Sequence, residues 1–91
     1  MPPSRPRELR LPDLGVAGQT ARLSVWLVED GHEVTEGDRL VEILVGNATV
    51  DLPAPASGVL RQVLRSEDEP VSTGQLLGII EEAMSDATFG P

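Results

Sequence analysis

Short apolar runs, broken by turn-forming residues about every eight to twelve positions, fill the middle of this 91-residue chain. No segment sustains the 3.6-residue period of an amphipathic helix, so the pattern favours an all-β sandwich or barrel. It predicts strands at residues 8–11, 21–28, 39–45, 48–52, 58–65 and 76–82. We expect a disordered N-terminal arm over residues 1–7, one folded domain over 8–82, and a flexible tail or the start of a linker over 83–91.

Two alternating runs on either side of Gly46-Asn47 predict a tight β-hairpin. Glycine at the first central position accepts the positive φ of a type II′ turn. On the core face this register pairs Val45 with Ala48, Ile43 with Val50, and Val41 with Leu52. On the other face, which we expect to contact water, it pairs Leu44 with Thr49 and Glu42 with Asp51. Asn47 is therefore expected at the exposed tip.

The chain also repeats itself weakly at an offset of 37 positions. Leu23, Leu27, Val34, Gly37, Leu40 and Ile43 return as Leu60, Leu64, Val71, Gly74, Leu77 and Ile80. We interpret this as two copies of a strand–turn–strand unit, each too small to bury its apolar face alone. The copies would pack as pseudo-symmetric halves of one sandwich. Coincidence among the many valines and leucines is the alternative.

Charge and composition argue against several classes of function. The formal net charge of -8 repels a phosphate backbone, which argues against nucleic-acid binding. No apolar run approaches the ~20 residues of a membrane span, so we expect no membrane partner. The N-terminal residues contain no apolar signal core, which predicts a cytoplasmic protein. The absence of cysteine excludes a thiolate nucleophile and a cysteine-based metal site.

All seven basic residues are arginines, so the chain contains no lysine. This excludes Schiff-base chemistry, an amine nucleophile and any prosthetic group joined to a lysine side chain. A general preference for arginine over lysine would explain the composition equally well, unless one position requires an amine.

Five segments, in this order and spacing, resemble the biotinyl/lipoyl carrier domains. They are residues 11–15, 26–31, 34–43, 48–60 and 71–77. The resemblance covers residues 8–82 and is strongest to the lipoyl domain of dihydrolipoyl acyltransferases in 2-oxo acid dehydrogenase complexes. It implies a flattened barrel or sandwich of two four-stranded antiparallel sheets with pseudo-twofold symmetry.

The resemblance also implies a site. In that family the hairpin tip carries Asp-Lys, and the lysine receives lipoic acid through an amide bond. The equivalent position here is Asn47, flanked at the hairpin tip by Val45, Gly46 and Ala48. An asparagine amide nitrogen is not nucleophilic, because its lone pair is delocalised into the carbonyl. We therefore expect no bound cofactor, although lipoate is the cofactor of the family.

A second departure affects the loop that lies beside this hairpin in the family and helps partner enzymes to recognise the domain. The possible docking loop consists of Val16, Ala17, Gly18, Gln19, Thr20 and Ala21. Family members usually place Glu-Gly where this chain has Thr20-Ala21, so recognition by the usual decarboxylase partner is in doubt.

Three other features have competing interpretations. His32 with Glu29, Asp30 and Glu33 could suggest a metal site, but one histidine among carboxylates on a turn is better explained as a solvated loop. Trp26 could stack on a ligand, although a partly buried core residue is the simpler interpretation. The acidic run at residues 67–69 imitates a catalytic cluster, yet its place in the repeat predicts an exposed turn.

These inferences predict a domain without catalytic or metal-binding residues of its own. The leading hypothesis is a non-lipoylated interaction or structural module of an acyltransferase-type system, with acyltransferase or 2-oxo acid dehydrogenase-type proteins as partners. One alternative is a genuine lipoyl carrier whose natural sequence has a lysine at position 47. Another is a small-molecule binding protein, which would require a concave apolar pocket.

Overall fold

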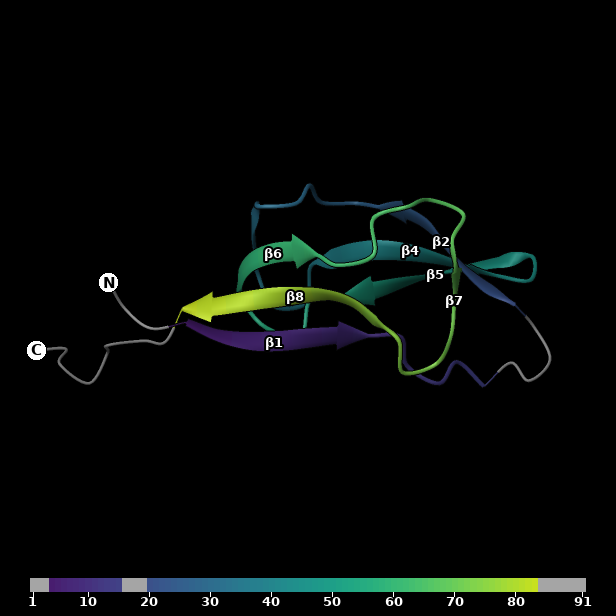
Figure 1. Cartoon of the computed structure of the whole chain (residues 1–91), viewed down its shortest axis with the longest axis horizontal. Helices are drawn as coiled ribbons and strands as arrows, with labels where there is room; N and C mark the ends of the chain where they lie inside the picture. Colours follow the sequence, from purple (N-terminus) through teal and green to yellow (C-terminus); the bar gives the residue numbers. More distant parts are fainter. Residues whose placement is uncertain (1–3, 16–19, 84–91) are drawn as a thin grey trace, which may run out of the picture.

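Two four-stranded antiparallel sheets pack face to face in the computed structural model, which describes residues 4–15 and 20–83 (Figure 1). The strands are β1 (Ser4–Arg10), β2 (Ala21–Trp26), β3 (Glu33–Val34), β4 (Arg39–Val45), β5 (Ala48–Pro53), β6 (Gly58–Gln62), β7 (Pro70–Val71) and β8 (Leu76–Ala83). This arrangement confirms the predicted fold class. The described part of the chain contains no helix that is long and apolar enough to cross a membrane.

The sheet order reproduces the sequence repeat. One sheet has the order β1-β8-β6-β3 and the other the order β5-β4-β2-β7, so each strand has a counterpart at the same place in the other sheet. Connecting hydrogen bonds are duplicated as well. The Gly31 amide donates to the Leu60 carbonyl at 2.8 Å, and the Asp68 amide donates to the Leu23 carbonyl at 2.7 Å. The pseudo-twofold symmetry predicted from the repeat is confirmed.

The core between the sheets is built from the repeated positions. The fully buried repeat pairs are Leu23 and Leu60, Leu40 and Leu77, and Ile43 and Ile80. Since the two members of each pair come from different sheets, neither half has a core without the other. Burying side chains of this kind contributes roughly 1.5–3 kcal/mol each before the loss of conformational entropy is subtracted.

The predicted register of the β4–β5 hairpin is confirmed at every pair from Val41–Leu52 to Val45–Ala48. Val41, Ile43 and Val45 are buried, as alternation requires, but Ala48 is exposed and Val50 is half-buried. The prediction that Ala48 is a core residue is therefore wrong. Its partner Val45 is buried, but Ala48 comes directly after the turn on the edge strand β5, where its side chain stays exposed.

The first strand begins earlier than predicted. β1 starts at Ser4, so residues 4–7 are paired rather than part of a disordered arm. The prediction failed because Pro6 and two arginines suggested a loop, whereas β8 supplies both a strand to pair with and an acidic partner. The Glu82 carboxylate accepts hydrogen bonds from the guanidinium groups of Arg5 and Arg7, each at 3.2 Å. Residues 1–3 of the predicted arm and 84–91 of the predicted tail lie outside the described residues.

Other boundaries differ by a few residues. The strands predicted at 21–28 and 58–65 end at Trp26 and Gln62, where the chain leaves the sheet to form the loops that cross to the opposite sheet. The two-residue strands β3 and β7 were not predicted, because two residues are too few to show an alternating pattern. Both cap an edge of their sheet next to a longer strand, β6 and β2 respectively.

Candidate functional site

The hairpin tip lies at one end of the molecule. Figure 1 shows the β4–β5 turn projecting beyond the two sheets, at the opposite end of the molecule from the start of β1 and the end of β8. Gly46 has a φ of 61°, a conformation that glycine adopts without steric cost, whereas Asn47 is not among the described residues with positive φ. These values match the predicted type II′ turn. Gly46, Asn47 and Ala48 are exposed, and Val45 directs its side chain into the core.

The chemistry available at this tip is limited. Asn47 presents a carboxamide, which donates and accepts hydrogen bonds. An activated carboxylic acid that would acylate a lysine amine does not react with this carboxamide nitrogen. Thr49, exposed on the following strand, adds a hydroxyl group. The nearest ion pair on β4 and β5 joins Arg39 to Asp51 at 3.7 Å, at the other end of the hairpin. The tip residues therefore do not fit a lipoyl or biotinyl group.

The possible docking loop is only partly described. Residues 16–19 lie outside the described ranges, while Thr20 is exposed and Ala21 begins β2. Ala21 pairs with Val45 of β4 on one side and with Val71 of β7 on the other. The end of this loop is thus positioned beside the base of the hairpin tip. Its role in docking stays a prediction.

The structure also shows the surroundings of His32, the acidic run at residues 67–69 and Trp26, which had competing interpretations. His32 Nε2 is 3.8 Å from the Glu29 carboxylate on an exposed turn, and the described residues contain no group of three side chains that could hold a metal ion. Glu67 and Asp68 are exposed, as the repeat predicted, and Glu69 is half-buried. Trp26 is half-buried against the core, which confirms its interpretation as a partly buried core residue.

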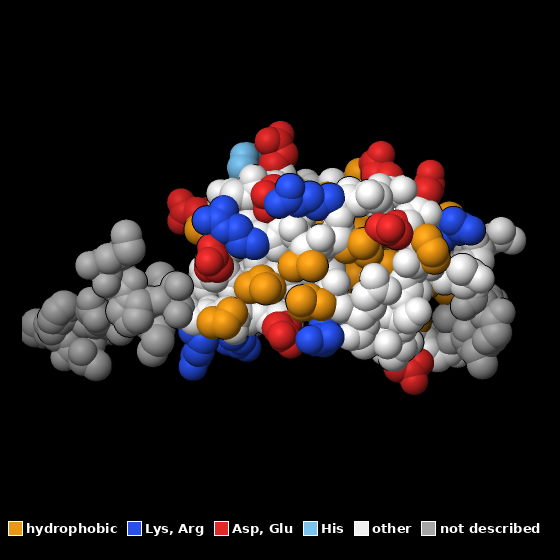
Figure 2. All heavy atoms as spheres, in the orientation of Figure 1, with side chains coloured by type: hydrophobic (Ala, Val, Ile, Leu, Met, Phe, Trp, Pro, Cys, Tyr) orange, Lys and Arg blue, Asp and Glu red, His pale blue; other side chains and the backbone are white. Residues whose placement is uncertain are grey.

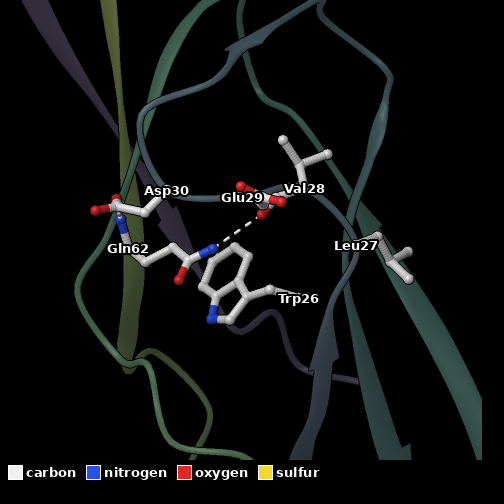
Figure 3. A pocket seen from close by; sticks show the side chains of 6 residues that line it. All are labelled: Trp26, Leu27, Val28, Glu29, Asp30 and Gln62. Carbon is white, nitrogen blue, oxygen red and sulfur yellow. Dashed lines mark hydrogen bonds between the residues drawn. The ribbon is translucent and has the colours of Figure 1, made fainter.

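Trp26 also borders a surface hollow of about 440 Å³ that sequence reasoning missed (Figure 3). The hollow is lined by Trp26, Leu27, Val28, Glu29, Asp30 and Gln62. Trp26 is the last residue of β2 and the next four residues follow it in the chain, whereas Gln62 ends β6, so only the folded chain brings them together. The sequence repeat gave an indirect signal of this site, because the second copy has Val63 at the position equivalent to Trp26.

Comparison with known proteins decides the classification. Residues 7–80 match the model of the biotinyl/lipoyl family, described as "Biotin-requiring enzyme". The chain belongs to this family. It is 30% identical over 81 residues to the dihydrolipoyllysine-residue succinyltransferase component of the 2-oxoglutarate dehydrogenase complex of Bacillus subtilis, covering 89% of this chain and 19% of that protein. It is 37% identical over 71 residues to the acetyltransferase component of the pyruvate dehydrogenase complex of Azotobacter vinelandii, covering 78% of this chain and 11% of that protein.

A third relative is the succinyltransferase component of the 2-oxoglutarate dehydrogenase complex of Escherichia coli, which is 32% identical over 78 residues, or 86% of this chain. The chain thus spans a fifth or less of the length of these relatives. It corresponds to a lipoyl-type domain of an acyltransferase component. Biotinyl/lipoyl domains are typically non-catalytic domains of larger enzymes.

Proposed function

We propose that this domain is a non-lipoylated interaction or structural module of an acyltransferase-type assembly. Its relatives are components of 2-oxo acid dehydrogenase complexes, which supports partners of that kind: an acyltransferase or a 2-oxo acid dehydrogenase-type enzyme. In this role the exposed β4–β5 turn and the loop that ends at Ala21 form a docking surface. The domain contributes binding and position, while catalysis occurs on other polypeptide segments.

The observation that carries this proposal is the identity of the residue at the exposed tip. Asn47 occupies an intact two-residue turn, yet its side chain offers an amide in place of an amine. No lysine elsewhere in the 91 residues can replace it, because all seven basic residues are arginines. The hairpin has kept its geometry, and the attachment chemistry has been lost without a change of fold.

Lipoylation measured by intact mass tests the proposal. The domain is co-expressed with a lipoate–protein ligase in cells supplied with lipoate, next to the double variant Gly46→Asp/Asn47→Lys. We expect the original chain to keep its unmodified mass and the double variant to gain one lipoyl group, since the turn already presents position 47 to solvent.

Asn47→Lys alone is the matched variant that restores the amine without the acidic neighbour. A lipoyl group on the unaltered chain would overturn the proposal and favour the alternative of a genuine carrier. If the double variant folds but stays unmodified, recognition has been lost beyond the tip, and the segment that includes Thr20 and Ala21 becomes the next region to exchange.

A further inference from the structure

The hollow beside Trp26 lies away from the hairpin tip. In the β2–β4 ladder Ala21 pairs with Val45 near the tip, while Trp26 pairs with Val41 at the other end of β2. Its inner side is held rigidly by hydrogen bonds: Trp26 Nε1 donates to the Leu64 carbonyl at 2.8 Å, and Gln62 Nε2 donates to the Val28 carbonyl at 2.9 Å. The Trp26 and Gln62 side chains are therefore held in place by the fold, whereas Glu29 at the rim is exposed.

Hydrogen-bond acceptors predominate around this opening. Figure 3 shows the Gln62 amide beside the indole of Trp26, with Glu29 above it, whereas the Asp30 carboxylate lies beyond Gln62 and points away from the ring. Within the described residues no donor contacts Gln62 Oε1, and the Glu29 carboxylate, 86% exposed, has only the 3.8 Å contact with His32. An aromatic ring next to these two available acceptors, the Glu29 carboxylate and Gln62 Oε1, suits a cation that also has hydrogen-bond donors.

One such cation is already present at the rim. Arg65 Nη2 lies 3.4 Å from Asp30 Oδ2, while Asp30 Oδ1 accepts a hydrogen bond from the Gln62 amide at 2.7 Å. The Arg65 side chain is mostly exposed and also donates from Nε to the Gln62 carbonyl at 3.2 Å, so it occupies Asp30 and leaves Glu29 and Gln62 Oε1 available to a second guanidinium. Figure 2 shows red acidic side chains spread over much of the visible surface, in keeping with the net charge of -8, which attracts cationic partners over a distance.

We propose that this hollow binds an arginine side chain from a basic peptide segment of a partner protein. The guanidinium plane stacks on the Trp26 indole, and its N–H groups donate to Glu29 and to Gln62 Oε1. Arginine fits better than lysine because its planar fork satisfies the ring and two acceptors together. The site is independent of the hairpin tip, so it would exist whether or not the domain is lipoylated.

Trp26 is the single tryptophan of the chain, so its emission reports on this site directly. The end-blocked tripeptide Gly-Arg-Gly is titrated into the full chain while Trp26 fluorescence and amide NMR shifts are followed. The matched ligand is Gly-citrulline-Gly, which keeps the planar shape and lacks the charge. We expect the arginine peptide to move the Trp26 indole and Gln62 side-chain signals, and the citrulline peptide to bind at least about threefold more weakly.

Charge variants separate a specific site from diffuse attraction. Glu29→Gln should weaken binding by about two- to fivefold. Glu36→Gln removes the same charge from an exposed side chain that does not line the hollow, and it should leave the affinity unchanged. Arg65→Gln, which removes a positive charge at the rim that repels the cationic ligand, should strengthen binding by about twofold.

Equal weakening by Glu29→Gln and Glu36→Gln would overturn the proposal, and so would equal binding of the citrulline peptide. Shifts centred outside the hollow, or no shift at millimolar peptide, would overturn it as well. None of these readouts depends on lipoylation, which is scored by intact mass, so the two proposals succeed or fail separately.

Discussion

Asp68 has a left-handed backbone conformation, with φ of 63°, at a position where the other half of the molecule has a glycine. Its repeat counterpart is Gly31, with φ of 90°. The backbone amide of each residue donates a hydrogen bond to the carbonyl of a core leucine, so the same turn occurs in both halves. Only the first half has glycine there, the residue that adopts this conformation without strain. Aspartate tolerates this region better than most residues, which explains how the second copy survives.

We predict that Asp68→Gly stabilises the domain by about 0.5–1 kcal/mol, because relief of the backbone strain outweighs the greater freedom of glycine in the unfolded chain. The interaction of Arg22 is kept, since its guanidinium donates to the backbone carbonyl of Asp68. Urea unfolding measures the change. The reciprocal variant Gly31→Ala should cost at least about 1 kcal/mol. A lower midpoint for Asp68→Gly would contradict this account.

The hairpin tip and the hollow differ in how well the sequence alone predicts them. Asn47 could be placed at an exposed tip because a two-residue turn and strict alternation fix both neighbouring strands. The hollow beside Trp26 could not be predicted, because Gln62 reaches it through pairing of β6 with β8 and through the hydrogen bond to Val28. A site formed by consecutive residues has a local signal, whereas one completed by a distant strand has none.

At the scale of elements, the same distinction separates the predicted strands from the missed ones. β4 and β5 have enough alternating positions, and the turn between them fixes the register. β3 and β7 have two residues each, and β1 begins with Ser4, Arg5 and Pro6, which have no apolar pattern. The start of β1 depends on its partner β8, so its extent is a property of the pair rather than of its own sequence.

The β1–β8 pair should make stability depend on pH. Hydrogen bonds from Arg5 and then Arg7 lower the pKa of the Glu82 carboxyl from its ordinary value near 4.5. A carboxyl whose pKa is lower in the folded state stabilises the fold above its unfolded-state pKa, and this contribution is lost as the pH falls through the folded-state pKa. The stability lost in Glu82→Gln should therefore be largest above about pH 5 and should shrink toward about pH 3.

Urea midpoints of the original chain and of Glu82→Gln across this pH range measure the effect. Glu36→Gln is the control, because the Glu36 side chain has no ion pair among the described residues and its variant should show no such trend. Since the Arg5 and Arg7 side chains are partly exposed, added salt should reduce the difference at neutral pH. A difference that grows on acidification would show that Glu82 acts in some other way.

At the scale of the whole molecule, the two halves share one core. The sheet that contains β6 and β8 contributes Leu60, Leu77 and Ile80, and the opposite sheet contributes Leu23, Leu40 and Ile43. This sharing explains why the fold does not depend on which side chains the exposed β4–β5 turn carries. The stability resides between the sheets, and Asn47 lies outside that region.

A shared core predicts that equivalent substitutions in the two halves have equivalent effects. Leu23→Ala and Leu60→Ala each remove a fully buried side chain at matching positions, so each should cost about 2–5 kcal/mol, and the two costs should be similar. Both variants should unfold in one transition, with Trp26 fluorescence and far-ultraviolet circular dichroism coinciding. Leu27→Ala, at an exposed position of the first half, is the control and should change the midpoint little. If either core variant unfolded in two steps, with the signal of Trp26 lost separately, the halves would be independent units and the repeat would describe two small cores rather than one.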